Sequence, residues 1–79
     1  MRNIIQKSIL NDDQWVVVFR YRDSNGNLTN RVVSPIRFLG DNRFLGLCLS
    51  REEPRQFYFD RCEDVQLRPA WDYVMPVAM

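Results

Sequence analysis

The sequence contains no histidine, and this absence removes several chemistries at once. Catalytic triads that need imidazole, histidine-ligated zinc sites and the usual general base near neutral pH are all excluded. Cys48 also lacks an activating base of the common kind, so it is a poor candidate nucleophile. A chain of 79 residues has little room for a substrate pocket of about 300 Å³ or more. We therefore expect a binding protein that carries no cofactor, and not an enzyme.

Lysine is almost absent as well, since Lys7 is the single lysine and the other ten basic residues are arginine. Arginine presents a planar fork of donors that holds carboxylates and phosphates in two-pronged fashion, and lysine does not. Anion recognition would explain this preference, and so would codon bias with solvated arginines on the surface. The 11 basic and 10 acidic residues give a net charge of +1, which excludes a strongly polycationic coat for nucleic acid.

The sequence also lacks long apolar runs, CxxC spacing and a secretory signal. No run approaches the roughly 18–20 residues of a membrane helix, and the first seven residues are too polar for a secretory signal. Cys48 and Cys62 lie 14 residues apart, and without such a signal they predict reduced, mostly buried thiols, with a disulfide as the alternative. We therefore expect a cytoplasmic protein that does not contact a membrane.

The pattern of apolar residues predicts a single domain of a short helix followed by strands. Ile4, Ile5 and Ile9 have helical spacing, so residues 1–13 are expected to form a helix over 1–10 and a lead-in. From Gln14 the apolar period changes to two, and turns divide the rest of the chain. The strands expected from this pattern span about 14–22, 28–38, 43–49, 55–61 and 63–67.

This succession of short strands and tight turns predicts a mainly β fold. We expect residues 14–68 to form a small five-stranded antiparallel barrel of SH3-like or Sm-like type, because closure hides the sheet edges. In the second strand Val32 and Ile36 are assigned to one face and Arg31 to the other. In the third strand the alternating leucines at 45, 47 and 49 are expected to point inward. Residues 69–79 form an apolar tail that should pack on the barrel or on a partner.

The segment from Tyr21 to Leu67 resembles the WYL domain of bacterial regulators. The likeness rests on four stretches in the family's order, namely a hairpin at 21–27, an Arg-x-Val-x-Pro strand within 29–36, the place of the name-giving Trp-Tyr-Leu at 43–45, and an Arg-x-Phe-x-x-Asp-Arg-Ile segment at 55–62. The chain departs from the family where Arg43 replaces the tryptophan and Cys62 replaces an aliphatic residue. The helix-turn-helix domain that usually precedes this domain does not fit here, so the resemblance implies a domain that stands alone or comes from a longer protein.

The resemblance implies a barrel that senses a negatively charged ligand, such as a nucleotide or single-stranded nucleic acid, in bacterial transcriptional regulation. Carried over position by position, the family's basic residues are Arg31, Arg55 and Arg61, with Phe57 and Asp60 in the same motif. Tyr58 is added because the alternation of its strand places it on the outer face, where a base could stack. The expected ligand-binding residues are therefore Arg31, Arg55, Phe57, Tyr58, Asp60 and Arg61.

Each of these residues also has a purely structural interpretation. Arg31 would be an exposed strand residue, Phe57 would belong to the core, and Arg61 would pair with Asp60 or Glu63. The acidic residues of this region lack the pattern of a metal site. Four further arginines are expected to be solvated, namely Arg20, Arg22, Arg37 and Arg43.

A second functional hypothesis is an SH3-like module for protein interaction or oligomerisation. Its basis is the near-neutral charge together with the apolar tail that contains Trp71 and Tyr73. The partners considered are thus an anionic small ligand or single-stranded nucleic acid, a second copy of the chain, or a DNA-binding regulator supplied by another chain.

Overall fold

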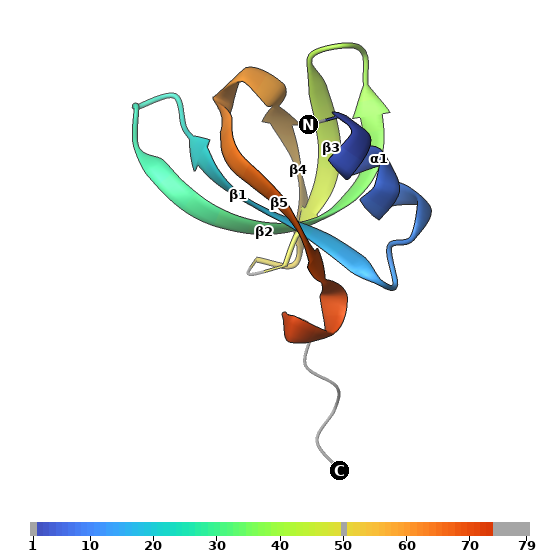
Figure 1. Cartoon of the computed structure of the whole chain (residues 1–79). Coiled ribbons are helices and arrows are strands. Elements are labelled where there is room, and N and C mark those ends of the chain that lie inside the picture. The colour runs from blue at the N-terminus through green and yellow to red at the C-terminus, as the bar shows by residue number, and fades with distance from the viewer. Residues whose placement is uncertain (1, 50, 74–79) are drawn as a thin grey trace.

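A computed structural model describes residues 2–49 and 51–73 of the chain (Figure 1). In chain order the elements are α1 (Arg2–Leu10), β1 (Trp15–Arg22), β2 (Leu28–Leu39), β3 (Arg43–Cys48), β4 (Glu53–Tyr58), the 3₁₀ helix η1 (Phe59–Arg61), β5 (Cys62–Pro69) and the 3₁₀ helix η2 (Ala70–Asp72). The sequence-based prediction of a mainly β fold with five antiparallel strands and a short N-terminal helix is confirmed.

The five strands form one antiparallel sheet in the order β4-β3-β2-β1-β5. The first half of β2 pairs with β1 and its second half pairs with β3, so that Val33 is opposite both Val17 and Cys48. The sheet curls about this strand into a cup, with the β1–β2 hairpin on one side and β3 on the other (Figure 1). No ladder joins the two edge strands within the described residues, so the predicted barrel is not closed by hydrogen bonds.

Side chains, rather than backbone pairing, connect the two halves of the cup. The ring centroids of Tyr21 and Phe57 are 5.1 Å apart and nearly perpendicular, and those of Phe19 and Phe57 are 5.3 Å apart. Edge-to-face pairs of this kind are worth about 0.5–1.5 kcal/mol beyond their buried area. The backbone N–H of Tyr58 also donates to the Tyr21 hydroxyl at 3.1 Å. These contacts hold the end of β4 against the end of β1.

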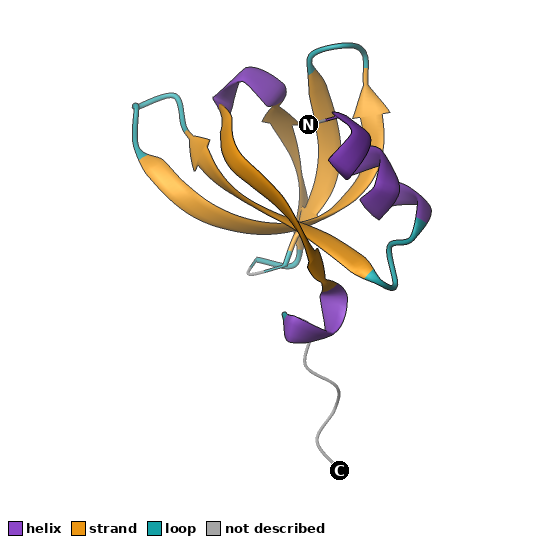
Figure 2. Cartoon of the chain, viewed as in Figure 1, coloured by secondary structure: helices purple, strands orange, loops and turns teal. Residues whose placement is uncertain are grey.

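Helix α1 covers one side of the cup and packs on β1, β2 and β5 (Figure 2). Ile5 and Ser8 are fully buried in this packing, and the Ser8 hydroxyl donates to the carbonyl of Trp15 at 2.9 Å. A buried hydroxyl without such a partner would be costly. The Arg2 guanidinium lies 4.1 Å from the ring centroid of Phe38, so the start of the helix is held by a stacked cation.

Three details differ from the sequence-based prediction. The fourth strand ends at Tyr58 and turns into η1, and does not continue to Arg61. On β2 the buried residues are Val33 and Pro35, whereas Ile36 is 46% exposed. On β3 the buried positions are Phe44, Gly46 and Cys48, and the leucines are only half-buried. The register of β2 with β1 determines these faces, since Val33 is opposite the buried Val17.

Gly46 lies on the inner face of β3, where the Val33 side chain of β2 fills the space that a Cβ would need. A Cβ at this position would lie 2.3 Å from Cγ1 of Val33, which is itself fully buried. Since a buried β-branched side chain has little rotamer freedom, it cannot move aside cheaply. The close packing of this corner of the sheet therefore depends on glycine.

We expect Gly46→Ala to lower the free energy of unfolding by about 1–3 kcal/mol, because an added methyl overpacks the core. Urea denaturation followed by circular dichroism measures this loss. The matched control is the same substitution in a Val33→Ala background, where the methyl has space and its effect should shrink. Equal stability of Gly46→Ala and the parent chain would contradict this account of the corner.

Candidate functional site

Arg31 and Arg55 both lie on the inner face of the sheet. Arg31 on β2 is directly opposite Phe19, and Arg55 on β4 precedes Phe57 by two positions on the same face. Residues directly opposite on antiparallel strands have Cβ atoms about 5 Å apart, and residues two apart on a strand are separated by about 7 Å. Because the Phe19 and Phe57 rings are in contact, the two arginines flank one aromatic pair from opposite halves of the cup.

Both guanidinium groups lack an acidic partner among residues 2–49 and 51–73. The ion pairs within the described residues join Arg20 to Asp64 and Arg22 to Glu63 on the outer side of β1 and β5. Arg31 donates only from Nε, to the Thr29 hydroxyl at 3.1 Å, which leaves its two terminal nitrogens for another acceptor. Each arginine is half-buried rather than fully solvated. On the inner face, the two arginines beside the Phe19–Phe57 contact are therefore candidates for binding an anion.

The structure places Arg61 elsewhere, because the strand has ended before it. Arg61 is exposed on η1, and its Cζ lies 5.6 Å from the ring centroid of Tyr58. Tyr58 is half-buried and, being adjacent to the inward Phe57, lies on the outer face. Asp60 is exposed and forms no ion pair with a described residue, so the expected pairing with Arg61 is not seen. The predicted residues thus fall into an inner pair and an outer group on η1 and the end of β4.

Phe57 itself lies in the centre of the core and is 1% exposed. It contacts the rings of Phe19, Tyr21 and Phe44. Its burial agrees with the structural interpretation given to it from the sequence. In a binding site, the Phe57 ring would support Arg31 and Arg55 from within the core and would not itself contact a ligand.

Arg43 belongs with the outer group, although the sequence placed it among the solvated arginines. It is opposite Tyr58 in the β3–β4 ladder, its Cζ lies 5.9 Å from that ring centroid, and its Nη1 donates to Oε1 of Gln56 at 3.2 Å. Its Nε is buried and has no hydrogen-bond partner among the described residues. The register of β3 with β4 brings this arginine to Tyr58. Because no local sequence signal predicts that register, the sequence could not place Arg43 beside Tyr58.

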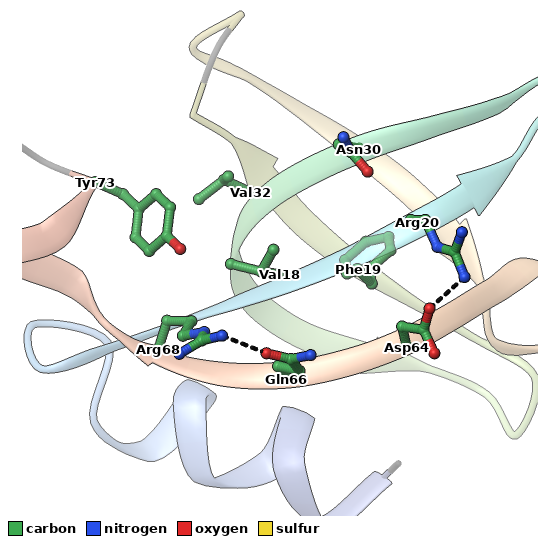
Figure 3. A pocket seen from close by; sticks show the side chains of 9 residues that line it. All are labelled: Val18, Phe19, Arg20, Asn30, Val32, Asp64, Gln66, Arg68 and Tyr73. Atoms are coloured by element: carbon green, nitrogen blue, oxygen red, sulfur yellow. Dashed lines mark hydrogen bonds and ion pairs between the residues drawn. The ribbon is translucent and has the colours of Figure 1, made fainter.

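An open groove of about 490 Å³ lies away from Tyr58, on the outer surface formed by β1, β2 and β5 (Figure 3). Val18 and Val32 form part of its wall, and Tyr73 lies at one end. Its two arginines are already engaged, since Arg20 pairs with Asp64 and Arg68 donates to Gln66. Asp64 adopts a φ of 53° at a β5 bulge opposite β1, which aims its carboxylate at Arg20. The ion pair of Arg20 with Asp64 leaves this groove one arginine without a charged partner among the described residues, Arg68, whereas the inner face has two.

Cys62 begins β5 directly after η1, and its thiol donates to the carbonyl of Tyr58 at 3.3 Å. Burial raises the pKa of this thiol from 9.0 to about 12, and the negative charge of Asp60 adds to the effect. A thiol in this state is not a nucleophile at neutral pH. The described residues also contain no group of three or more metal-ligating side chains, and none of their helices is long and apolar enough to cross a bilayer.

Comparison with known families and structures agrees with this geometry. The family model of the WYL domain matches residues 3–67, which include α1, β1 to β4 and most of β5. The solved structure of proteasome accessory factor B/C (PafBC) of Arthrobacter aurescens is similar, with a TM-score of 0.67 and 23% identity. The alignment covers 95% of this chain and 13% of that one, so the likeness concerns the fold of one part of PafBC. A search of curated proteins returned no match.

Since the folded chain holds the Cys62 proton tightly, native protein at pH 8 should contain roughly 1000-fold less Cys62 thiolate than unfolded protein. We expect alkylation of this residue by iodoacetamide to be slow until urea unfolds the chain, with peptide mapping to assign the modified cysteine. The thiol's contribution to stability is complete below about pH 9 and is lost as the pH rises toward 12. Asp60→Asn should speed native alkylation, whereas rapid alkylation of the native parent chain would contradict the burial of this thiol.

Proposed function

Since the chain belongs to the WYL-domain family, we propose that it is a ligand-sensing regulatory domain that binds a nucleotide or single-stranded nucleic acid through Arg31 and Arg55. The observation that carries this proposal is the placement of two arginines without acidic partners beside one aromatic pair, Phe19 and Phe57. Two guanidinium groups that flank one aromatic pair would match the multiple oxygens of a phosphate.

The mechanism is charge-assisted hydrogen bonding without covalent chemistry. Arg31 is oriented through its Nε by Thr29, so its terminal nitrogens face the ligand. The packed rings beside the two arginines keep water from screening the charges fully, which strengthens their attraction for phosphate. Nothing in this arrangement requires a nucleophile or a general base, and we propose a non-catalytic role.

We further propose that binding is passed to a DNA-binding component in bacterial transcriptional regulation, inside the cytoplasm. That component would belong to a longer protein or to another chain, since the chain spans only 13% of the PafBC structure to which it is similar. We also propose that residues 14–68, in an SH3-like or Sm-like arrangement of strands, form the body of this sensing domain.

Replacing Arg31 or Arg55 with glutamine should weaken binding of a labelled oligothymidylate of about eight nucleotides. Each lost phosphate contact should also reduce the slope of log affinity against log salt by about 1. Fluorescence anisotropy at several salt concentrations measures both effects. Arg68→Gln is the matched control, because Arg68 is exposed on β5 and donates to Gln66. Equal affinities for the control and for both variants would remove the basis of the proposed site.

A second candidate function is self-association through the C-terminal end, for which the exposure of Trp71 is the specific observation. This side chain is 75% exposed on η2 and lies beside Asp13 and Gln14. Tyr73 is 40% exposed, and residues 74–79 of the expected tail lie outside the described part of the chain. An exposed indole of this kind is typical of a contact surface.

If the indole forms such a contact, the parent chain should sediment as an oligomer and Trp71→Ser should sediment as a monomer. Leu10→Ser is the matched control, since Leu10 is another exposed apolar residue, at 71%. Analytical ultracentrifugation over a range of concentrations distinguishes the two. A parent chain that remains monomeric at every concentration would argue against this second function.

A further inference from the structure

The geometry points to a second nucleic-acid contact on the outer face of the sheet, formed by Arg43, Tyr58 and Arg61. This inference rests on the proposed function, because it concerns which anionic ligand the domain takes. With a contact on each face of the edge strand β4, the ligand class is a single-stranded nucleic acid of several nucleotides and not a mononucleotide.

The three residues converge from two strands and a turn. The ladder places Arg43 beside Tyr58, and η1 folds Arg61 back toward the same ring. The Cζ atoms of the two arginines lie 5.9 and 5.6 Å from the ring centroid of Tyr58, respectively. Both guanidinium groups lie over the Tyr58 ring, but farther from its centroid than Arg2 lies from that of Phe38, at 4.1 Å. A base can therefore displace one guanidinium from the half-buried ring or stack on it, and the two cations stay close enough to hold phosphate.

The charges of this outer group are not neutralised within the described residues. Arg43 and Arg61 form no ion pair, and Asp60, which precedes Arg61 in the chain, forms none either. Arg43 uses Nη1 to hold Gln56, while its buried Nε lacks a partner. An arginine retained for stability alone would be expected to satisfy its buried donor. Two uncompensated cations at one aromatic ring instead favour an anionic partner.

The position of the group relative to the inner pair determines the length of the ligand. Arg55 and Tyr58 are on opposite faces of β4, three residues apart, or about 10 Å along the strand. Since β4 is an edge strand, a chain can pass over it from one face to the other. One nucleotide cannot contact both faces, whereas a flexible strand of several nucleotides can. The two contacts together should therefore make affinity depend on ligand length.

The test compares thymidine monophosphate with a labelled oligothymidylate of about eight nucleotides on the full chain. Tyr58→Leu should weaken oligomer binding by about 5- to 150-fold, the range expected for one lost stacking contact. Arg43→Gln should weaken it as well and reduce the salt slope by about 1. Tyr58→Phe keeps the ring and should bind as the parent does. Arg68→Gln controls for the loss of one positive charge, and circular dichroism establishes that each variant is folded.

Mononucleotide binding should be unchanged in Tyr58→Leu and Arg43→Gln, because it uses Arg31 and Arg55 alone. If oligomer binding survives both outer substitutions but is lost in Arg55→Gln, the outer contact is refuted while the proposed function stands. If mononucleotide and oligomer weaken equally in Tyr58→Leu, a single site is present and the length argument fails. If neither ligand binds the parent chain at low salt, the proposed function fails and this inference falls with it.

Discussion

The contact between the ends of β1 and β4 is the constraint on which the rest of this fold depends. The sheet is not closed by hydrogen bonds, so the Tyr21–Phe57 ring contact and the bond from the Tyr58 N–H to the Tyr21 hydroxyl hold its halves together. The same contact determines what each residue of β4 faces. It turns Phe57 inward onto Phe19, keeps Arg55 on the inner face, and leaves the Tyr58 ring on the outside. Fold stability and the geometry of both candidate contacts therefore depend on one aromatic cluster.

The distribution of acidic residues explains how a chain of net charge +1 can still attract an anion. Glu63 and Asp64 follow η1 on β5. The register of β5 with β1 brings them to Arg22 and Arg20, respectively, with which they form ion pairs. Exposed pairs of this kind add little stability, about 0–1 kcal/mol each. Their larger effect is to neutralise Arg20 and Arg22 on β1, while the arginines of β2, β3, β4, η1 and β5 form no ion pair within the described residues. The net charge does not reveal which arginines are paired, because the pairing follows from the order of the strands and not from the composition.

Sequence patterns were sufficient for the order of elements and insufficient for the faces of β2 and β3. Helical spacing of Ile4, Ile5 and Ile9 and the Asn-Gly turn predict α1 and the first hairpin correctly. The alternating leucines of β3 predict the wrong inner face. The residue that is buried between Phe44 and Cys48 is Gly46, and the Val33 side chain occupies the space beside it. The alternating pattern of residues 55–61 also predicts that the fourth strand continues to Arg61, although the chain turns into η1 at Phe59. For the site, motif positions locate Arg31 and Arg55, but only the β3–β4 register brings Arg43 to Tyr58.

Arg43 and Phe44 show how neighbouring residues of one strand can serve the surface and the core separately. By the resemblance, Arg43 stands where the family's name-giving motif begins with tryptophan, and its guanidinium lies over the Tyr58 ring, while Phe44 is buried in the core. The inward Phe44 packs with Phe19 and Phe57, and the outward Arg43 places a charge at the candidate contact. Because successive strand residues face opposite sides, the two roles can change independently. Ligand preference at this edge can thus diverge while the aromatic core that positions it stays the same.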